Sequence, residues 1–446
     1  MATGFPLLIL LLLSLVFIVL TSTVFKLHPF LSLLLASVGL GLSSGMSLEK
    51  VIQIITGGFG SLMAGIGLVI VLGTIIGVIM EKTGAAERLA QFVLQLFGIK
   101  RLIPAVSVMG GLVGIPVFCD SGFIILSQLN KKLAQLSGKG RISLNLALAG
   151  GLYATHVLVP PTPGPLAAAG NLGAEDELGM VIIIGLICTI PALVVSGWWA
   201  SRCKETIELS EDEITPPSSE QKHLPPLTTS LLPIFLPVLL IALASILKIM
   251  AVEGAISSTI IAIGNPNVAL LIGVACAFLL FEKWDKTHVM DWIGKGLTQA
   301  GPILLITCAG GAFGAVIKET PVVALFQSLT QQGAISEIWL FPIIFLLAAG
   351  LKTSQGSSTA SMVITSSMIA ALLPVWGLTS SIDMALVVVV IGAGAMTVSH
   401  ANDSYFWVVN NFGGMKMQQT YRTFTVATLL QGIVILLAAM GLKLIF

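Results

Sequence analysis

The sequence predicts an all-α polytopic membrane protein, made of two inverted repeats that each hold about five spans and one re-entrant helical hairpin, with broken helices at the midplane. Three observations predict this fold. Of 446 residues, 56% are apolar and 10% are charged, whereas roughly 25% are charged in soluble chains. Apolar runs of about 20 residues, enough to cross a bilayer, recur along the chain. A series of polar and proline-rich interruptions occurs once in each half.

Composition also excludes several classes of protein. A net charge of +1 gives no basic face for nucleic acid. The five cysteines are widely spaced and contain no Cys-x-x-Cys pair, which predicts neither a disulfide framework nor a zinc site. Phosphate-binding and zinc-protease motifs are missing from the sequence. We therefore expect a protein that is not an enzyme and that uses no cofactor or metal.

Eight apolar runs predict plain spans, and the first of them is interpreted as a span, not a cleaved signal. They lie near residues 5–25, 28–45, 57–80, 178–201, 228–250, 257–281, 298–317 and 423–446.

Four other apolar segments contain breaks. Residues 101–137 and 337–373 carry "GIPVFCDSGF" and "LKTSQGSSTASM" in their middles and are too long for one crossing. They predict hairpins whose irregular tips are buried in protein, where non-helical backbone is tolerated. Residues 141–173 and 382–414 contain "VPPTPGPL" and "VSHANDSYF" and predict spans broken in the middle. The polar residues 202–227 predict a cytoplasmic linker.

An internal repeat supports a division into residues 1–201 and 228–446. "GVIMEKTG" at 77–84 aligns with "GAVIKETP" at 314–321, and the broken spans carry Thr155-His156 and Ser399-His400. Each half has an odd number of crossings, so the halves are expected to be inverted in the membrane. Inverted repeats with broken elements are typical of secondary transporters, which bind substrate near the midplane.

The basic residues predict the orientation. Counting crossings places 17 of the 22 Lys and Arg on one side, which the positive-inside rule assigns to the cytoplasm. Lys352 is counted on the other side. Both termini are therefore expected to face the periplasm or exterior.

Asp120 lies in the first hairpin tip, followed by Ser121 and Gly122. A central charge costs at least about 2.5–3.5 kcal/mol on insertion scales, which favours a role in binding a proton, an ion or substrate hydroxyls. The alternative is a carboxylate that caps the following helix.

The second tip gathers amide and hydroxyl groups, and the free N–H groups of a helix that restarts there suit an anionic ligand group. The alternative is a small-residue helix contact. The tip residues expected to bind substrate are Gln355, Gly356, Ser357, Ser358 and Thr359.

The two broken spans supply further candidates. Four prolines within six residues cannot occupy one regular helix, so the first span must break near His156 and Thr162. The second offers His400, Asn402 and Asp403. Histidine titrates near neutral pH, which makes His156 and His400 candidates for proton coupling beside Asp120 and Asp403. A buried, structurally satisfied histidine is the alternative for each.

With these segments in view, the chain resembles the gluconate permease family of bacterial inner membranes, the gluconate:proton symporters of the ion-transporter superfamily. The resemblance rests on "GIPVFCDSGF", "THVLVPPTPGPLAAA", "SQGSSTASM" and "SHANDSYFW". Members often have an aromatic residue where this chain has Cys119, and a histidine where it has Thr162. The resemblance implies a homodimer with an elevator-like motion and proton-coupled import of gluconate or a related small hydroxy-acid anion.

The leading hypothesis is a symporter whose substrate carboxylate meets the helix start at Ser357–Thr359. Its hydroxyls would meet Asp120, Thr162, His156 or Asn402. D-Serine, glycerate or a hydroxybutyrate are alternative substrates, and sodium is an alternative coupling ion. A passive channel and an intramembrane enzyme are the competing classes, but a pore needs a continuous polar lining and no paired nucleophile motif is present.

Overall fold

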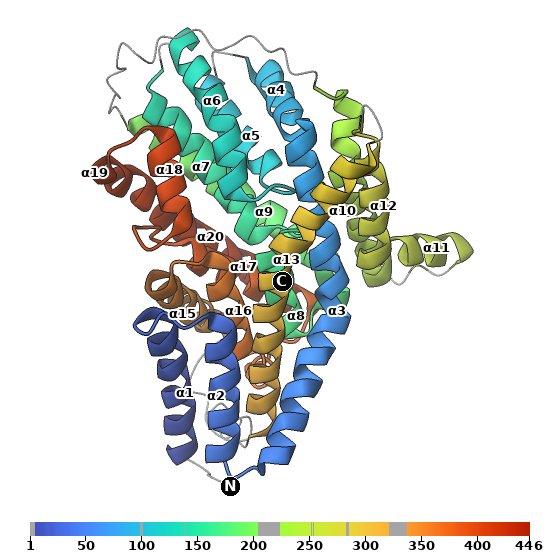
Figure 1. The fold of residues 1–446 in the computed structure, drawn as a ribbon, viewed down its shortest axis with the longest axis vertical. Coiled ribbons are helices and arrows are strands. Elements are labelled where there is room, and N and C mark those ends of the chain that lie inside the picture. The colour runs from blue at the N-terminus through green and yellow to red at the C-terminus, as the bar shows by residue number, and fades with distance from the viewer. Residues whose placement is uncertain are drawn as a thin grey trace.

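The structure is a computed structural model that describes residues 5–98, 101–137, 139–203, 224–250, 252, 254–281, 285–320 and 337–446. Within these ranges every regular element is a helix, which confirms the all-α prediction (Figure 1). The first half contains α1 (Phe5–Thr23), α2 (Pro29–Ser43), α3 (Leu48–Thr83), α4 (Ala85–Phe97), α5 (Leu102–Val113), α6 (Cys119–Ser137), α7 (Arg141–Leu158), α8 (Pro163–Leu172), the short 3-10 helix η2 (Glu175–Glu177) and α9 (Leu178–Arg202).

The second half repeats much of this order. It contains α10 (Leu227–Ile249), α11 (Ala255–Ile263), α12 (Pro266–Phe278), α13 (Lys286–Glu319), the 3-10 helix η4 (Glu337–Trp339), α15 (Leu340–Gln355), α16 (Ser358–Ile369), α17 (Ser381–Met396), α18 (Ser404–Gly413), α19 (Met417–Thr420), the π-helical turn η5 (Tyr421–Thr425) and α20 (Val426–Ile445). Most of the expected linker, residues 204–223, lies outside the described residues.

Seven of the described helices are long and apolar enough to cross a bilayer, and the bent pair α11–α12 would make eight. The prediction of a plain span at 257–281 is wrong, because these two helices meet at an angle of 66°. Gly264 ends α11, the Asn265 side chain accepts a hydrogen bond from the amide of Asn267, and Pro266 starts α12. An Asn cap followed by Pro at the first helical position starts a new helix instead of continuing the old one.

The chain leaves its helices inside all four segments expected to contain breaks. Residues 114–118 separate α5 from α6, and a two-residue turn separates α15 from α16. Residues 159–162 separate α7 from α8, where the Pro160–Pro161 peptide bond is cis. Residues 397–403 separate α17 from α18. The re-entrant path of the two hairpins stays a prediction.

Elements of the two halves pack against each other in matching pairs. The long helices α3 and α13 lie side by side (Figure 1). The second hairpin helix of each half contacts the helix after the break in the other half: α16 packs on α8, and α6 packs on α18. Each hairpin is thereby brought to a helix break of the opposite half.

Candidate functional site

The first hairpin tip holds a carboxylate whose polar atoms are only partly paired. Asp120 lies in the first turn of α6 and its Oδ2 faces the Cys119 thiol at 3.7 Å. Its Oδ1 is buried with no hydrogen-bond partner. Gly122 packs so closely on Leu152 that a Cβ there would contact the Leu152 side chain, so it serves packing; Ser121 is half-buried beside it.

His156 and Thr162 flank the break between α7 and α8 in different ways. His156 is 6% exposed, its ring lies 5.7 Å from the Phe118 ring, and its Nδ1 is buried without a partner. The Thr162 hydroxyl donates to the carbonyl of Val159 at 2.6 Å, so it is satisfied locally. With Thr74 and nearby prolines they line a cavity of about 10 Å³, which is about the volume needed for one water.

The second hairpin tip is a left-handed turn followed by a capped helix. Gly356 ends α15 at a φ of 79°, and the Ser357 side chain caps α16 by accepting from the amide of Ala360 at 3.2 Å. Ser358 and Thr359 form the first turn of α16. Both polar atoms of the Gln355 amide are buried without a partner.

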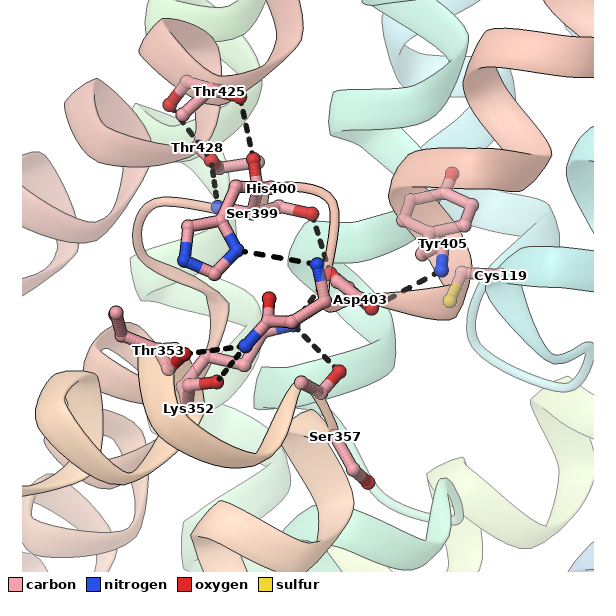
Figure 2. Close-up of polar contacts among 12 residues, drawn as sticks. Cys119, Lys352, Thr353, Ser357, Ser399, His400, Asp403, Tyr405, Thr425 and Thr428 are labelled. Atoms are coloured by element: carbon pink, nitrogen blue, oxygen red, sulfur yellow. Dashed lines mark hydrogen bonds and ion pairs between the residues drawn. The ribbon is translucent and has the colours of Figure 1, made fainter. Parts of the chain in front are cut away.

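A buried ion pair joins this tip to the break between α17 and α18 (Figure 2). Lys352 Nζ lies 2.5 Å from Asp403 Oδ2, and the two residues are 1% and 4% exposed. Lys352 also donates to the carbonyl of Gly356 at 3.1 Å. Asp403 caps α18 by accepting from the amide of Tyr405, and it accepts from the hydroxyl of Ser399.

Side chains of α20 and its preceding turn hold this break in an uncommon conformation. Val398 has a φ of 54°, a left-handed backbone that costs a β-branched residue of order 1–3 kcal/mol. The hydroxyl of Thr428 accepts from the amide of Ser399, while Thr425 donates to its carbonyl (Figure 2). Such over-determined strain is typical of functional sites.

Asn402 and His400 complete the break. The Asn402 amide nitrogen donates to the carbonyl of Thr353, so this side chain ties the break to the second tip. His400 is half-buried, and its Nδ1 faces the amide nitrogen of Asn402 at 3.5 Å.

The clusters of the two halves are close in space. The charges of Asp403 and Lys352 both act electrostatically on Asp120 and Cys119. Cys119 lies beside Tyr405 and Asp403 in Figure 2. The structure therefore brings Asp120, Lys352 and Asp403 together from different halves. Among the described residues, no group of three His, Cys, Asp or Glu side chains is arranged to hold a metal ion.

Sequence reasoning missed Lys352. The count of cations gives it no role beyond membrane orientation, whereas its side chain is buried and paired. Its place within an apolar segment could have revealed it. An ionisable residue in such a segment predicts a functional role, as it did for Asp120.

Comparisons with known proteins place the chain among permeases. The model of the family described as "GntP family permease" matches residues 6–445. A protein of Pseudomonas aeruginosa named gluconate permease is 32% identical over 414 residues, which cover 90% of each chain. The D-serine transporter DsdX of Escherichia coli is 31% identical over 441 residues, or 96% of each chain.

The fold is similar to the crystal structure of the Alcanivorax borkumensis YdaH transporter, whose topology is described as unusual. The TM-score is 0.66 at 16% sequence identity, over 93% of this chain and 97% of the other; this likeness shows the fold alone. The match over residues 6–445 confirms the resemblance to gluconate permeases. The chain belongs to the GntP permease family and is a multi-span membrane permease.

Proposed function

We propose that this permease is a proton-coupled carrier of gluconate or a related small hydroxy-acid anion, which binds between the two hairpin tips. One observation carries the proposal: Asp120 Oδ1, His156 Nδ1 and the Gln355 amide are buried without partners. Buried polar groups are nearly always hydrogen-bonded. A polyhydroxy acid supplies hydroxyls that would pair with all three.

The charges of the site favour entry of a proton with each anion. Lys352 is matched by Asp403, which leaves Asp120 as an unmatched acidic group when all three are ionised. An anion placed about 6 Å from that carboxylate is repelled by about 3 kcal/mol at an effective dielectric of 20. Protonation of a carboxylate removes this cost, so the loaded state takes up a proton that the empty state does not need.

The start of α16 suits the acidic end of the substrate. Its first N–H groups, at Ser357 to Thr359, carry the positive end of the helix dipole. The hydroxyl chain would then extend toward Asp120 and His156. Thr162 and Asn402 use their hydrogen bonds within the protein and shape the site instead.

Substrate entry requires movement. The cavity of about 10 Å³ beside His156 is far smaller than a six-carbon acid. We propose an elevator-like displacement of the hairpins and breaks relative to α3 and α13, within a homodimer in a bacterial inner membrane. Light scattering of the purified protein tests the dimer, since a monomeric mass would contradict it.

Transport in proteoliposomes tests the coupling. With acid outside, the wild-type protein is expected to accumulate gluconate, and the variant that lacks the coupling carboxylate, Asp120→Asn or Asp403→Asn, should retain counterflow but lose accumulation. Asp176→Asn, at an exposed position near α9, is the matched control and should behave as wild type. Unchanged pH-driven accumulation by Asp120→Asn would show that Asp120 is not the coupling group.

The same assay separates the alternatives. Accumulation driven by a sodium gradient but not by a pH gradient would assign sodium as the coupling ion. Competition by D-serine, glycerate or 3-hydroxybutyrate against labelled gluconate ranks the substrates, and the similarity to a D-serine transporter makes D-serine the first competitor to try. Equilibration without accumulation under either gradient would indicate a passive channel.

A further inference from the structure

The Lys352 ammonium has the geometry of an anion anchor that is already occupied. It has three N–H donors. One points to Asp403 Oδ2 at 2.5 Å, another to the carbonyl of Gly356 at 3.1 Å, and the nitrogen lies 5.9 Å from the centre of the Tyr153 ring. Asp403 is thus the anionic partner of a buried cation.

This ammonium lies at the place where the proposed site needs positive charge. Lys352 is one turn before Gln355, whose amide has no partner, and it bonds to the residue that precedes the cap of α16. A carboxylate at the start of α16 would therefore lie next to Lys352. Asp403, by contrast, belongs to the break of α17–α18 and reaches the ammonium from the other side of the tip (Figure 2).

We infer that Lys352 binds the substrate's carboxylate, and that Asp403 is the internal substitute that holds Lys352 until Asp403 is protonated. This inference rests on the proposed function and adds the anchoring residue and the exchange. Lys352 would then select substrates that carry a carboxylate, and Asp403 would carry the proton that is transported with the substrate.

The exchange balances in charge and protons. A proton from the outer solution binds a carboxylate oxygen of Asp403 and ends its ion pair, while Lys352 stays protonated and pairs with the incoming carboxylate. The neutral Asp403 keeps the amide of Tyr405 and the hydroxyl of Ser399 as partners. On release of the substrate, Asp403 loses the proton to the other side and pairs with Lys352 again.

Other titratable side chains surround this pair and could influence the exchange. They are Cys119 and Asp120 on α6, Tyr153 and His156 on α7, His400 in the break, Tyr405 on α18 and Tyr421 on η5. Asp120 is a carboxylate like Asp403, so the test must show which of the two takes up the proton.

The competing interpretation is a purely structural ion pair. Breaking a buried pair by removing one partner leaves an uncompensated charge, whereas replacing both partners by neutral groups is often tolerated. The two interpretations therefore differ in what the doubly neutral variant does with substrate.

The experiment measures gluconate binding by thermal shift and calorimetry on the full-length protein at pH 5.5 and 7.5, with the uncharged polyol sorbitol as the blank. Four proteins are compared: wild type, Asp403→Asn, Lys352→Gln and the double variant. Asp383→Asn is the matched control, because Asp383 forms another ion pair, with Lys443 at 2.6 Å.

We expect the wild type to bind gluconate at least tenfold more tightly at pH 5.5 than at pH 7.5. Asp403→Asn should melt lower without ligand, bind gluconate at both pH values with the affinity of the acid form, and lose the pH dependence. Lys352→Gln and the double variant should not bind gluconate, although the double variant regains the melting temperature of the wild type. Asp383→Asn should keep the affinity and pH dependence of the wild type.

Two results would overturn the inference. One is gluconate binding by the double variant with wild-type affinity, which would make the pair structural. The other is unchanged pH dependence in Asp403→Asn, which would move the proton to Asp120. If Asp403→Asn does not fold, the double variant still decides between the interpretations. Failure of the wild type to bind gluconate, D-serine or glycerate at either pH would instead contradict the proposed function.

Discussion

At the scale of single residues, two glutamines differ in how their buried side-chain amides are paired. Gln431 is fully buried, and its amide nitrogen donates to the carbonyls of Gly150 and Ala192. The amide oxygen of Gln431 has no hydrogen-bond partner, whereas in Gln355 both the amide oxygen and the amide nitrogen lack one. A buried amide that bonds to protein stabilises the fold, while one without a partner costs stability unless a ligand pairs with it.

Replacing each glutamine by leucine tests this difference. Gln355→Leu should leave the melting temperature unchanged or raised, because no hydrogen bond is lost, and should weaken gluconate binding by about 1–3 kcal/mol. Gln431→Leu should destabilise the protein by about 1–3 kcal/mol and leave affinity unaltered. Thermal melts with a gluconate titration check both. Equal loss of stability in the two variants would contradict a ligand-binding role for Gln355.

Residue identity predicted part of this site and missed another part. Asp120 stood out because a charge deep in an apolar segment is costly, His156 because histidine titrates near neutral pH, and Gln355 because it belongs to the polar second tip. Lys352 lies in the same tip segment as Gln355, but it was counted only among the cations on the other side of the membrane. The ion pair with Asp403 could not be predicted, since the two residues are far apart in sequence and only the packed tip brings them together.

At the scale of elements, the second tip depends on how closely two backbones approach. Gly356 turns the chain with a positive φ, and a Cβ at this position would overlap the carbonyl oxygen of Asn402. Gly173 has a similar φ of 75° at the end of α8, with open space around it. The two glycines therefore share the backbone conformation and differ in the contact.

Replacing each of these two glycines by alanine separates the cost of the left-handed backbone from the cost of the close contact with Asn402. Gly173→Ala should cost about 1–2 kcal/mol for the left-handed backbone. Gly356→Ala should lower the free energy of unfolding by about 1–3 kcal/mol more, because the added Cβ overpacks the turn. It should also weaken substrate binding, because Asn402 must move. Melting curves and gluconate titrations of both variants provide the comparison. Equal destabilisation would show that the tip and the break do not need this approach.

Local signals predicted the breaks better than the bends. The proline-rich segment "VPPTPGPL" placed the interruption in residues 141–173, and the polar segment "VSHANDSYF" placed the one in residues 382–414; helices end at both places in the structure. The run 257–281 looked continuous by hydropathy, yet its Gly264-Asn265-Pro266 sequence is a recognised turn signal that hydropathy outweighed. Hydropathy averages over a window and therefore does not register a two-residue bend.

At the scale of the whole molecule, the two halves interlock through equivalent elements. Helix α3 packs on α13, and the second helix of each hairpin packs on the helix after the break in the opposite half; the inverted orientation of the halves stays a prediction. The sequence repeat predicted the halves, but contacts such as Tyr405 to the carbonyl of Ala149 depend on packing between them. Such contacts arise from tertiary structure and have no local sequence signal.

Inverted orientation predicts which surface residues face the exterior. Glu49, at the start of α3, and Lys416, before α19, are both exposed, and the orientation predicted from the basic residues puts them on the outer and cytoplasmic sides, respectively. In intact spheroplasts, a membrane-impermeant maleimide should label Glu49→Cys but not Lys416→Cys, with the unmodified chain as the blank and lysed cells as the positive control. The opposite labelling pattern would reverse the assigned orientation.

The most direct test of the central claim is a density map of the protein determined with gluconate at pH 5.5. The account predicts density for the acid between the two tips, with its carboxylate at Lys352 and the start of α16, and its hydroxyls at Gln355 and Asp120. Gluconate bound outside the two tips, with Lys352 still paired to Asp403, would contradict it.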